Sequence, residues 1–148
     1  MRLEIIALIA GIFVLLLFLL AVFIRKVPKR LKGDMYAERW KVLQAHCRDK
    51  KTWPLAITEA DKLLDKALKR RKFKGKRMGE RMVSAQRKFT NNDAVWFAHN
   101  LCKKVLTDPD ARLREADVKT ALLGFRQALR DLGALESSES VAAKKGEK

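Results

Sequence analysis

An uninterrupted apolar run near the N-terminus constrains this chain more than any other feature. Residues 5–24 are all Ile, Ala, Leu, Gly, Phe or Val. A helix rises about 1.5 Å per residue, so a helix of this length covers the hydrocarbon core of a bilayer, which is about 30 Å thick. A helix also satisfies its own backbone hydrogen bonds, which lipid cannot do. The sequence therefore predicts a transmembrane anchor within residues 1–24.

A cleaved signal peptide is the competing interpretation of this run. Such a peptide has a basic start, an apolar centre of about 7–15 residues and a small-residue cleavage site. Here Glu4 offsets Arg2, the apolar run is longer, and Arg25 and Lys26 follow it directly with no small-residue site. These features favour an anchor that is retained.

The charges that flank the run predict its direction. Five cations follow it, whereas only Arg2 precedes it; the five are Arg25, Lys26, Lys29, Arg30 and Lys32. The positive-inside rule then puts the N-terminus outside and residues 25–148 in the cytoplasm at the cell membrane. The five cations are expected to lie at the surface of the inner leaflet. Cys47 and Cys102 have no CxxC spacing, so in this reducing compartment we expect two free thiols rather than a disulfide or a metal site.

The remaining residues are strongly basic and suit one compact domain. The chain has a formal net charge of +16, and because Arg2 and Glu4 cancel, all of it belongs to residues 25–148. We expect a basic linker over residues 25–33, a folded domain over 34–134 and a disordered tail over 135–148, which is mainly Ser, Ala, Lys and Glu. The charge fits attraction to anionic lipid, and it also fits a nucleic-acid partner.

Apolar residues in the domain recur at helical spacing, and no segment alternates like a strand. We expect a first helix over about 35–50, with Asp34 as its N-cap, and a second that starts at Thr52 and Pro54 and stops at Gly75. Three more helices are expected over about 79–89, 93–106 and 113–132. Gly133 is the expected C-cap residue of the last one. The fold class is therefore all-α, an anchor followed by a bundle of four or five helices.

The same spacing predicts which side chains form the core. The clearest stripe lies on the last helix, at intervals of four and three residues. The expected core comprises Tyr36, Trp40, Leu43, Cys47, Ile57, Ala60, Leu64, Ala67, Leu68, Val95, Trp96, His99, Cys102, Leu106, Val118, Leu122, Phe125, Leu129 and Leu132.

Residues 66–77, which we call the basic run, hold eight Lys or Arg and no acid. The cations are Lys66, Lys69, Arg70, Arg71, Lys72, Lys74, Lys76 and Arg77. Phe73 adds an aromatic ring that could stack on a base, so the run could grip a phosphate backbone. It could equally be a solvated helix end that lies against anionic lipid.

No residue pattern of an enzyme or a metal site stands out. His46 and His99 are the only histidines, and neither has further ligands at a zinc-like spacing. His99 lies on an apolar helix face, which is more typical of a hydrogen-bonded core histidine than of a catalyst. Gly75 and Gly79 lack the phosphate-loop spacing, and no GxSxG occurs. We expect no cofactor.

Four segments, in this order, resemble HEPN-like helical bundles. They are WPLAITEADKLLDKAL (53–68), FKGKRMGERMVSA (73–85), DAVWFAH (93–99) and DPD (108–110). In particular, they resemble small membrane-anchored HEPN-like proteins of candidate-phyla bacteria. Many members of that superfamily are metal-independent ribonucleases with an Arg followed, four to six residues later, by a His. The resemblance implies a helical bundle that often pairs with a second copy.

The positions that match this motif carry other residues. The Arg position is Cys102, the His position is Thr107, and Asp108 stands where an acid follows. A threonine cannot titrate near neutral pH, so general acid–base chemistry is absent there. Lys103 and Lys104 could still hold a phosphate. The resemblance therefore favours a non-catalytic binding module for RNA or protein, with inner-leaflet docking and a residual ribonuclease as alternatives.

Overall fold

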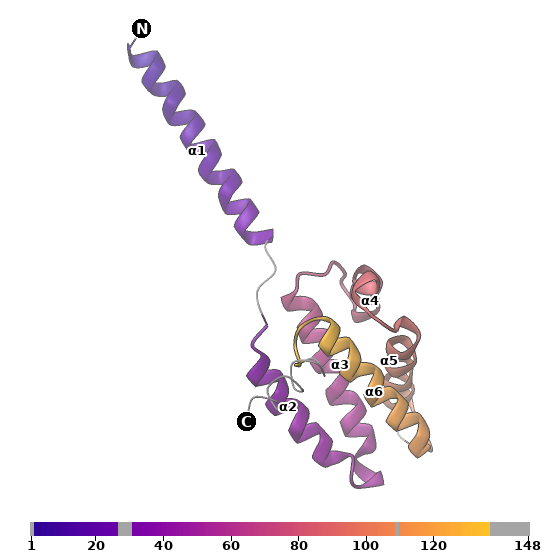
Figure 1. The fold of residues 1–148 in the computed structure, drawn as a ribbon. Coiled ribbons are helices and arrows are strands. Elements are labelled where there is room, and N and C mark those ends of the chain that lie inside the picture. Colours follow the sequence, from indigo (N-terminus) through magenta and orange to yellow (C-terminus); the bar gives the residue numbers. More distant parts are fainter. Residues whose placement is uncertain (1, 27–30, 109, 137–148) are drawn as a thin grey trace, which may run out of the picture.

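The computed structural model describes residues 2–26, 31–108 and 110–136. Within these ranges the regular structure is helical throughout and contains no strand, as predicted. The helices are α1 (Arg2–Lys26), α2 (Gly33–His46), α3 (Trp53–Arg70), α4 (Met78–Ala85), α5 (Asn92–Thr107) and α6 (Glu115–Asp131) (Figure 1). Two single 3₁₀ turns, η1 (Lys50–Thr52) and η2 (Gln86–Lys88), precede α3 and follow α4.

Helix α1 is long and apolar enough to span a membrane. Its segment Glu4–Ile24 has 21 residues and a mean hydropathy of 3.3, and none of its apolar window is buried in the structure. Figure 1 shows α1 standing apart from the other helices as a single rod. The predicted span is thus confirmed as a helix, which extends a turn of polar residues beyond the apolar run.

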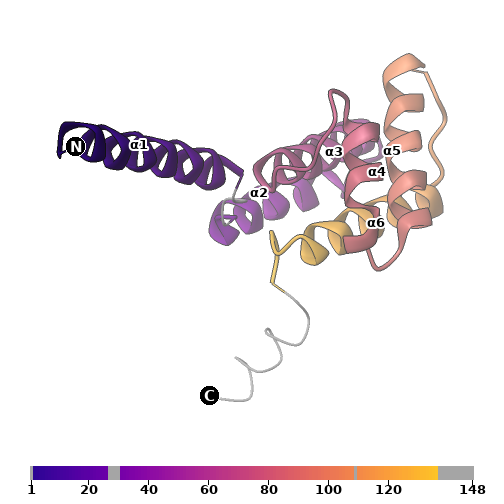
Figure 2. The same ribbon diagram turned by 90° about the horizontal axis from the view of Figure 1, so that it is seen from above.

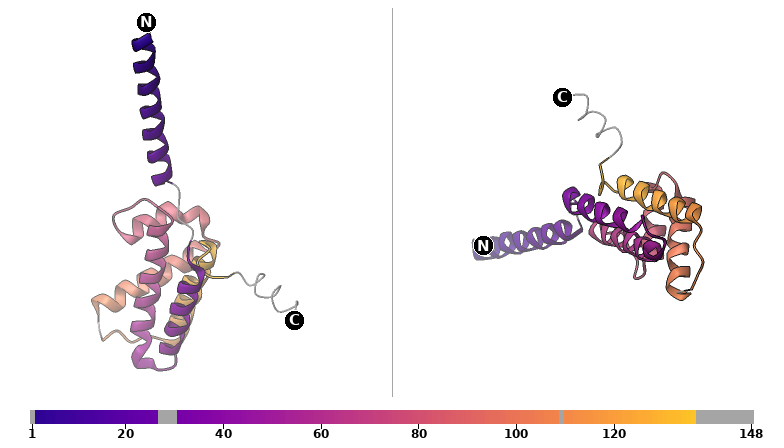
Figure 3. Two further views of the ribbon diagram at one scale, coloured as in Figure 1. Left: turned by 90° about the vertical axis from the view of Figure 1, so that its left-hand side faces the viewer. Right: turned by 90° about the horizontal axis from the view of Figure 1, so that it is seen from below.

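The other five helices form the predicted bundle. Helices α2 and α3 run antiparallel, and side-chain hydrogen bonds fix the turn between them. The Asp49 side chain accepts from the Lys51 backbone N–H at 3.0 Å, and the buried Trp53 indole donates to the Cys47 carbonyl at 3.0 Å. Helix α6 packs beside α3, while α5 runs crosswise to both (Figures 2 and 3).

The core contains most of the predicted stripe residues. Every predicted apolar position on α3 is buried, as are Val118, Phe125, Leu129 and Leu132. Cys102 is buried and Cys47 is half-buried, and both are free thiols. The prediction for Leu106 was wrong, because its side chain is 64% exposed. The buried face of α5 ends one residue earlier, at Val105, so the last turn of α5 projects beyond the core.

Both predicted boundaries of α2 needed correction. Asp34 is not the N-cap of α2, because the helix already includes Gly33 and the Lys32 carbonyl accepts the Tyr36 N–H. Asp34 instead lies in the first turn, where its charge complements the helix dipole. Helix α2 also ends at His46 rather than near residue 50. Gly133 does follow α6 with φ +73°, as a C-cap residue should.

One end of the bundle receives the chain from α1, and we call it the anchor-proximal end. Helix α2 begins there at Gly33, and six residues separate it from the end of α1 at Lys26. Because α3 is antiparallel to α2, the C-terminus of α3 lies at the same end. The segment after α6 also returns there, since Ala134 lies beside Gly33. Figures 1 and 3 show the α3–α4 loop at the end of the bundle that is nearest to α1.

Candidate anion-binding surface

The basic run begins on the last turns of α3 and continues through the loop to α4. Helix α3 ends in a Schellman motif, in which the Phe73 N–H donates to the Leu68 carbonyl and the Lys72 N–H to the Lys69 carbonyl. Lys72 occupies the left-handed position of this motif with φ 64°, where glycine is usual. Cations at this end of α3 also complement its dipole. The sequence predicted the helix end at Gly75, but the chain leaves the helix after Arg70.

A buried arginine on α4 holds the loop in place. The Arg81 side chain is 7% exposed and pairs with Asp65 of α3, with Nε at 2.8 Å from Oδ1. Its Nη1 donates to the carbonyls of Gly75 and Lys76 at 2.8 and 3.0 Å. The Glu80 carboxylate accepts the Lys76 N–H at 2.8 Å. These contacts therefore hold the backbone of the basic run in place. No local pattern singled out Arg81, which lies beyond the run.

The cations of the run differ in exposure. Lys66, Lys69, Lys72, Lys74, Lys76 and Arg77 are exposed, whereas Arg70 and Arg71 are half-buried. Lys69 also pairs with Asp65 at 2.7 Å. Phe73 packs partly buried against the core, so it is not the free stacking ring that the sequence suggested. The run is thus a cationic surface with no exposed aromatic, which fits headgroups better than bases.

Lys103 and Lys104 do not join the basic run. Both are exposed near the end of α5. Cys102, next to them, interacts with Thr58 and Asp61, in the first half of α3. Thr58 is eight residues before Lys66 and twelve before Arg70, which corresponds to about 12 and 18 Å along the helix. Figure 3 agrees, because the last turn of α5 lies away from the α3–α4 loop. The basic run and the lysine pair are therefore separate surfaces.

The predicted membrane-surface cations are only partly described. Lys32 is exposed at the start of α2. Lys29 and Arg30, and the side chains of Arg25 and Lys26, lie outside the described residues, as does the predicted disordered tail from residue 137 onward. Leu135, which we assigned to the tail, packs partly buried against the core.

Neither Cys102 nor Thr107, which the HEPN resemblance placed at the catalytic positions, is poised for acid–base chemistry. Cys102 is 1% exposed, and burial, with the Asp61 carboxylate adding to it, raises the pKa of its thiol to about 12. Thr107 is exposed, and its hydroxyl donates to the carbonyls of Lys103 and Lys104 at 3.0 and 3.1 Å. The thiol therefore stays protonated, and the hydroxyl is engaged by its own helix.

The two histidines have different surroundings. His99 is half-buried, with Nδ1 2.8 Å from Asp61 Oδ1, and its ring meets Trp96 edge-on. This is the hydrogen-bonded core histidine that the sequence predicted. His46 lies at the end of α2 on the rim of a groove. Among the described residues, no three His, Cys, Asp or Glu side chains are grouped as a metal ion would require.

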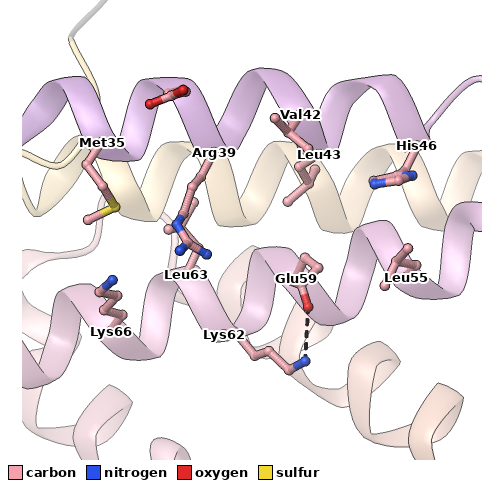
Figure 4. A pocket seen from close by; sticks show the side chains of 11 residues that line it. Met35, Arg39, Val42, Leu43, His46, Leu55, Glu59, Lys62, Leu63 and Lys66 are labelled. Atoms are coloured by element: carbon pink, nitrogen blue, oxygen red, sulfur yellow. Dashed lines mark hydrogen bonds and ion pairs between the residues drawn. The ribbon is translucent and has the colours of Figure 1, made fainter.

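That groove runs between α2 and α3 and has a volume of about 680 Å³ (Figure 4). Apolar side chains line it, including Val42 and Leu55, which are 60% and 45% exposed. Charged side chains stand at its edges, and the Glu59–Lys62 pair at 3.0 Å is drawn among them. The lining of the groove is therefore mixed, with apolar, acidic and basic side chains.

Comparison with known proteins found no match: no family model, no curated protein and no solved structure is similar to this chain.

Proposed function

We propose that this chain is a single-pass membrane protein whose HEPN-like, non-catalytic domain docks through its basic run on the anionic inner leaflet. Helix α1 spans the membrane with its N-terminus outside, and residues 25–148 lie in the cytoplasm. The long apolar helix and the five cations after it support this direction.

One observation carries the proposal: the basic run lies at the anchor-proximal end of the bundle. A domain that is joined to a membrane helix by six residues keeps this end close to the headgroups. Each Lys or Arg near an anionic leaflet contributes about 1 kcal/mol, and the attraction fades over a Debye length of about 8 Å. The exposed cations of the run therefore stabilise an orientation in which this end faces the membrane.

The proposal is non-catalytic because of the residues at two positions, Cys102 and Thr107. A thiol with a pKa of about 12 is neutral in the cytoplasm, and Thr107 has no proton to exchange near neutral pH. The separation of Lys103 and Lys104 from the basic run counts against one continuous track for RNA, because such a track needs neighbouring cations along a strand.

Trypsin cleavage of the full chain in nanodiscs tests the docking. Exposed Lys and Arg of the basic run should be cut more slowly when the disc contains phosphatidylglycerol than when it contains only phosphatidylcholine. Cleavage after Arg112, which is exposed in the segment between α5 and α6, should not depend on the lipid. High salt should remove the protection.

Matched variants sharpen this test. Replacing Lys72, Lys74 and Lys76 by Gln should abolish the lipid dependence of cleavage after Arg71 and Arg77. A variant with the same charge loss elsewhere, at Arg48, Lys51 and Lys119, should keep it. Equal cleavage in both kinds of disc would overturn the proposal, and protection that requires added RNA would replace the leaflet with RNA as the partner.

A further inference from the structure

A second cationic site lies away from the basic run, in a notch between the start of α5 and the C-terminal half of α6. The notch has a volume of about 360 Å³. Its polar lining consists of Asn91, Thr120, Arg126, Gln127 and Arg130, and we call it the arginine notch. Helices α5 and α6 pack closely against each other at Gly124, which lines the notch. A Cβ added there would lie 2.6 Å from the Ala94 carbonyl oxygen.

The two arginines of the notch lie one turn apart on α6, and neither has a carboxylate partner among the described residues. Like charges at this spacing destabilise a helix. Both side chains are half-buried, and the Nε of Arg130 is buried without an acceptor. Burial, followed by the charge of Arg126, lowers the pKa of Arg130. An anion in the notch would relieve the repulsion between the two guanidinium groups.

The neighbouring carboxylate does not fill this role. Asp131 follows Arg130 in the chain, but its oxygens accept from the Thr90 N–H at 2.7 Å and the Thr90 hydroxyl at 2.8 Å. The Gln127 amide donates to it as well, at 2.9 Å. Asp131 therefore fastens the loop before α5 to α6 and leaves the arginines unpaired.

The start of α5 also borders the notch, with Asp93 as an acidic residue in its first turn. The Asn91 side chain caps the helix by accepting the Ala94 N–H at 3.0 Å. The first N–H groups of a helix have no partner inside the helix and favour an anion nearby. The notch thus combines two arginine forks, a threonine hydroxyl and a helix start around one small space.

We propose that the arginine notch binds a phosphate group, either of a phosphomonoester headgroup in the leaflet or of a soluble phosphate. Paired guanidinium forks match the oxygens of a phosphate, to which they donate two parallel hydrogen bonds each. The inference deepens the proposed function and rests on it only where the phosphate comes from lipid. The notch lies on the half of α6 that leads to the anchor-proximal end, which leaves both sources open to it.

Thermal unfolding of the full chain in non-ionic detergent tests the inference. A ligand that binds only the folded state raises the melting temperature. Inorganic phosphate should raise it relative to chloride at equal ionic strength. Replacing Arg126 or Arg130 by Gln should weaken the apparent affinity about tenfold, as the loss of a charge-assisted pair does. Arg130→Lys keeps the charge but loses the fork, so it should also bind more weakly than the wild type.

Controls separate this site from general charge and from the basic run. Arg48→Gln with Arg112→Gln removes two exposed charges elsewhere and should leave the phosphate response unchanged. Lys72→Gln with Lys74→Gln and Lys76→Gln should also leave it unchanged, even though leaflet docking is lost. A response that survives in Arg126→Gln/Arg130→Gln, or no response in the wild type, would overturn the inference.

Micelles doped with lipid identify the source of the phosphate. Phosphatidate carries a phosphomonoester and phosphatidylglycerol a diester, and the two are compared at equal charge. A larger rise with phosphatidate, at lower concentration than with inorganic phosphate, supports a lipid headgroup in the notch. A rise with inorganic phosphate and no difference between the lipids supports a soluble phosphate.

Discussion

Asp61 and Asp65 lie one turn apart on the same helix, yet the structure uses them differently. Asp61 meets His99 of α5 at 2.8 Å, and both side chains are about 15% exposed. Asp65 pairs with the buried Arg81 of α4 and with the exposed Lys69 of its own helix. One carboxylate thus orients an imidazole, and the other compensates a buried positive charge. Neither is the solvated helix-surface group that their spacing would suggest.

The comparison shows that the stability lost with a carboxylate depends on the partner side chain that is left behind. A histidine can stay neutral when its partner is removed, whereas an arginine stays charged. An uncompensated charge in a buried position is far more costly than a lost hydrogen bond. We therefore expect the two aspartates to differ most in their effect on stability.

Asp65→Ala should have the largest effect. It leaves Arg81 buried without its anionic partner, and breaking such a pair costs about 3 kcal/mol or more in the free energy of unfolding. Chemical denaturation of the full chain in detergent measures this. The double variant Asp65→Leu/Arg81→Met should be less destabilised than Asp65→Ala alone. If the double variant is as unstable as the single one, the buried charge is not the cause.

The second prediction concerns the effect of acid on stability through Asp65. Burial alone would raise the pKa of Asp65, but hydrogen bonds and charge from Lys69 and Arg81 outweigh it and lower this pKa. A lowered folded-state pKa stabilises the fold above the unfolded value of about 3.9, and this stabilisation is lost as the pH falls through the folded value. The stability of the wild type should therefore fall more steeply below about pH 4 than that of Asp65→Asn. Parallel curves would contradict the prediction.

Asp61→Asn should have a smaller effect, about 1 kcal/mol in the free energy of unfolding. The amide can still form a hydrogen bond with the His99 ring, so only the part of the interaction that depends on the carboxylate charge is lost. Chemical denaturation of Asp61→Asn and Asp65→Asn under the same conditions compares their free energies of unfolding directly. A loss at Asp61 that equals or exceeds the loss at Asp65 would contradict the prediction.

Lys69→Gln should have the smallest effect, within about 0.5 kcal/mol, because exposed ion pairs contribute little. Its side chain is 61% exposed. Asp65 keeps its pair with Arg81, so the loop should hold its place, which the chemical shifts of residues 73–77 would report. A loss comparable to that of Asp65→Ala would mean that Lys69, rather than Arg81, is the essential partner.

Much of the fold could be predicted from the sequence because helix periodicity is local. The stripe from Val118 to Leu132 and the apolar face of α3 lie within single helices, and both were correct. The pairs Asp65–Arg81 and Asp61–His99 join residues 16 and 38 positions apart, so no local pattern reveals them. The arginine notch was missed for the same reason, since Arg126 and Arg130 look like ordinary surface residues until α5 is placed beside them. Leu106 was wrong because periodicity cannot show where a crossing helix leaves the core.

The antiparallel return of α3 has a consequence for how strongly the basic run needs to bind. Since α1 and the basic run lie at the same end of the bundle, the proposed docking on the leaflet would be an intramolecular step after insertion of α1. A short tether imposes an effective concentration in the millimolar range, and two linked weak contacts gain avidity without any new interaction. Contacts far too weak to recruit a free domain to a vesicle would then suffice to keep this one docked. A modest change in lipid charge would switch its orientation without releasing it from the membrane.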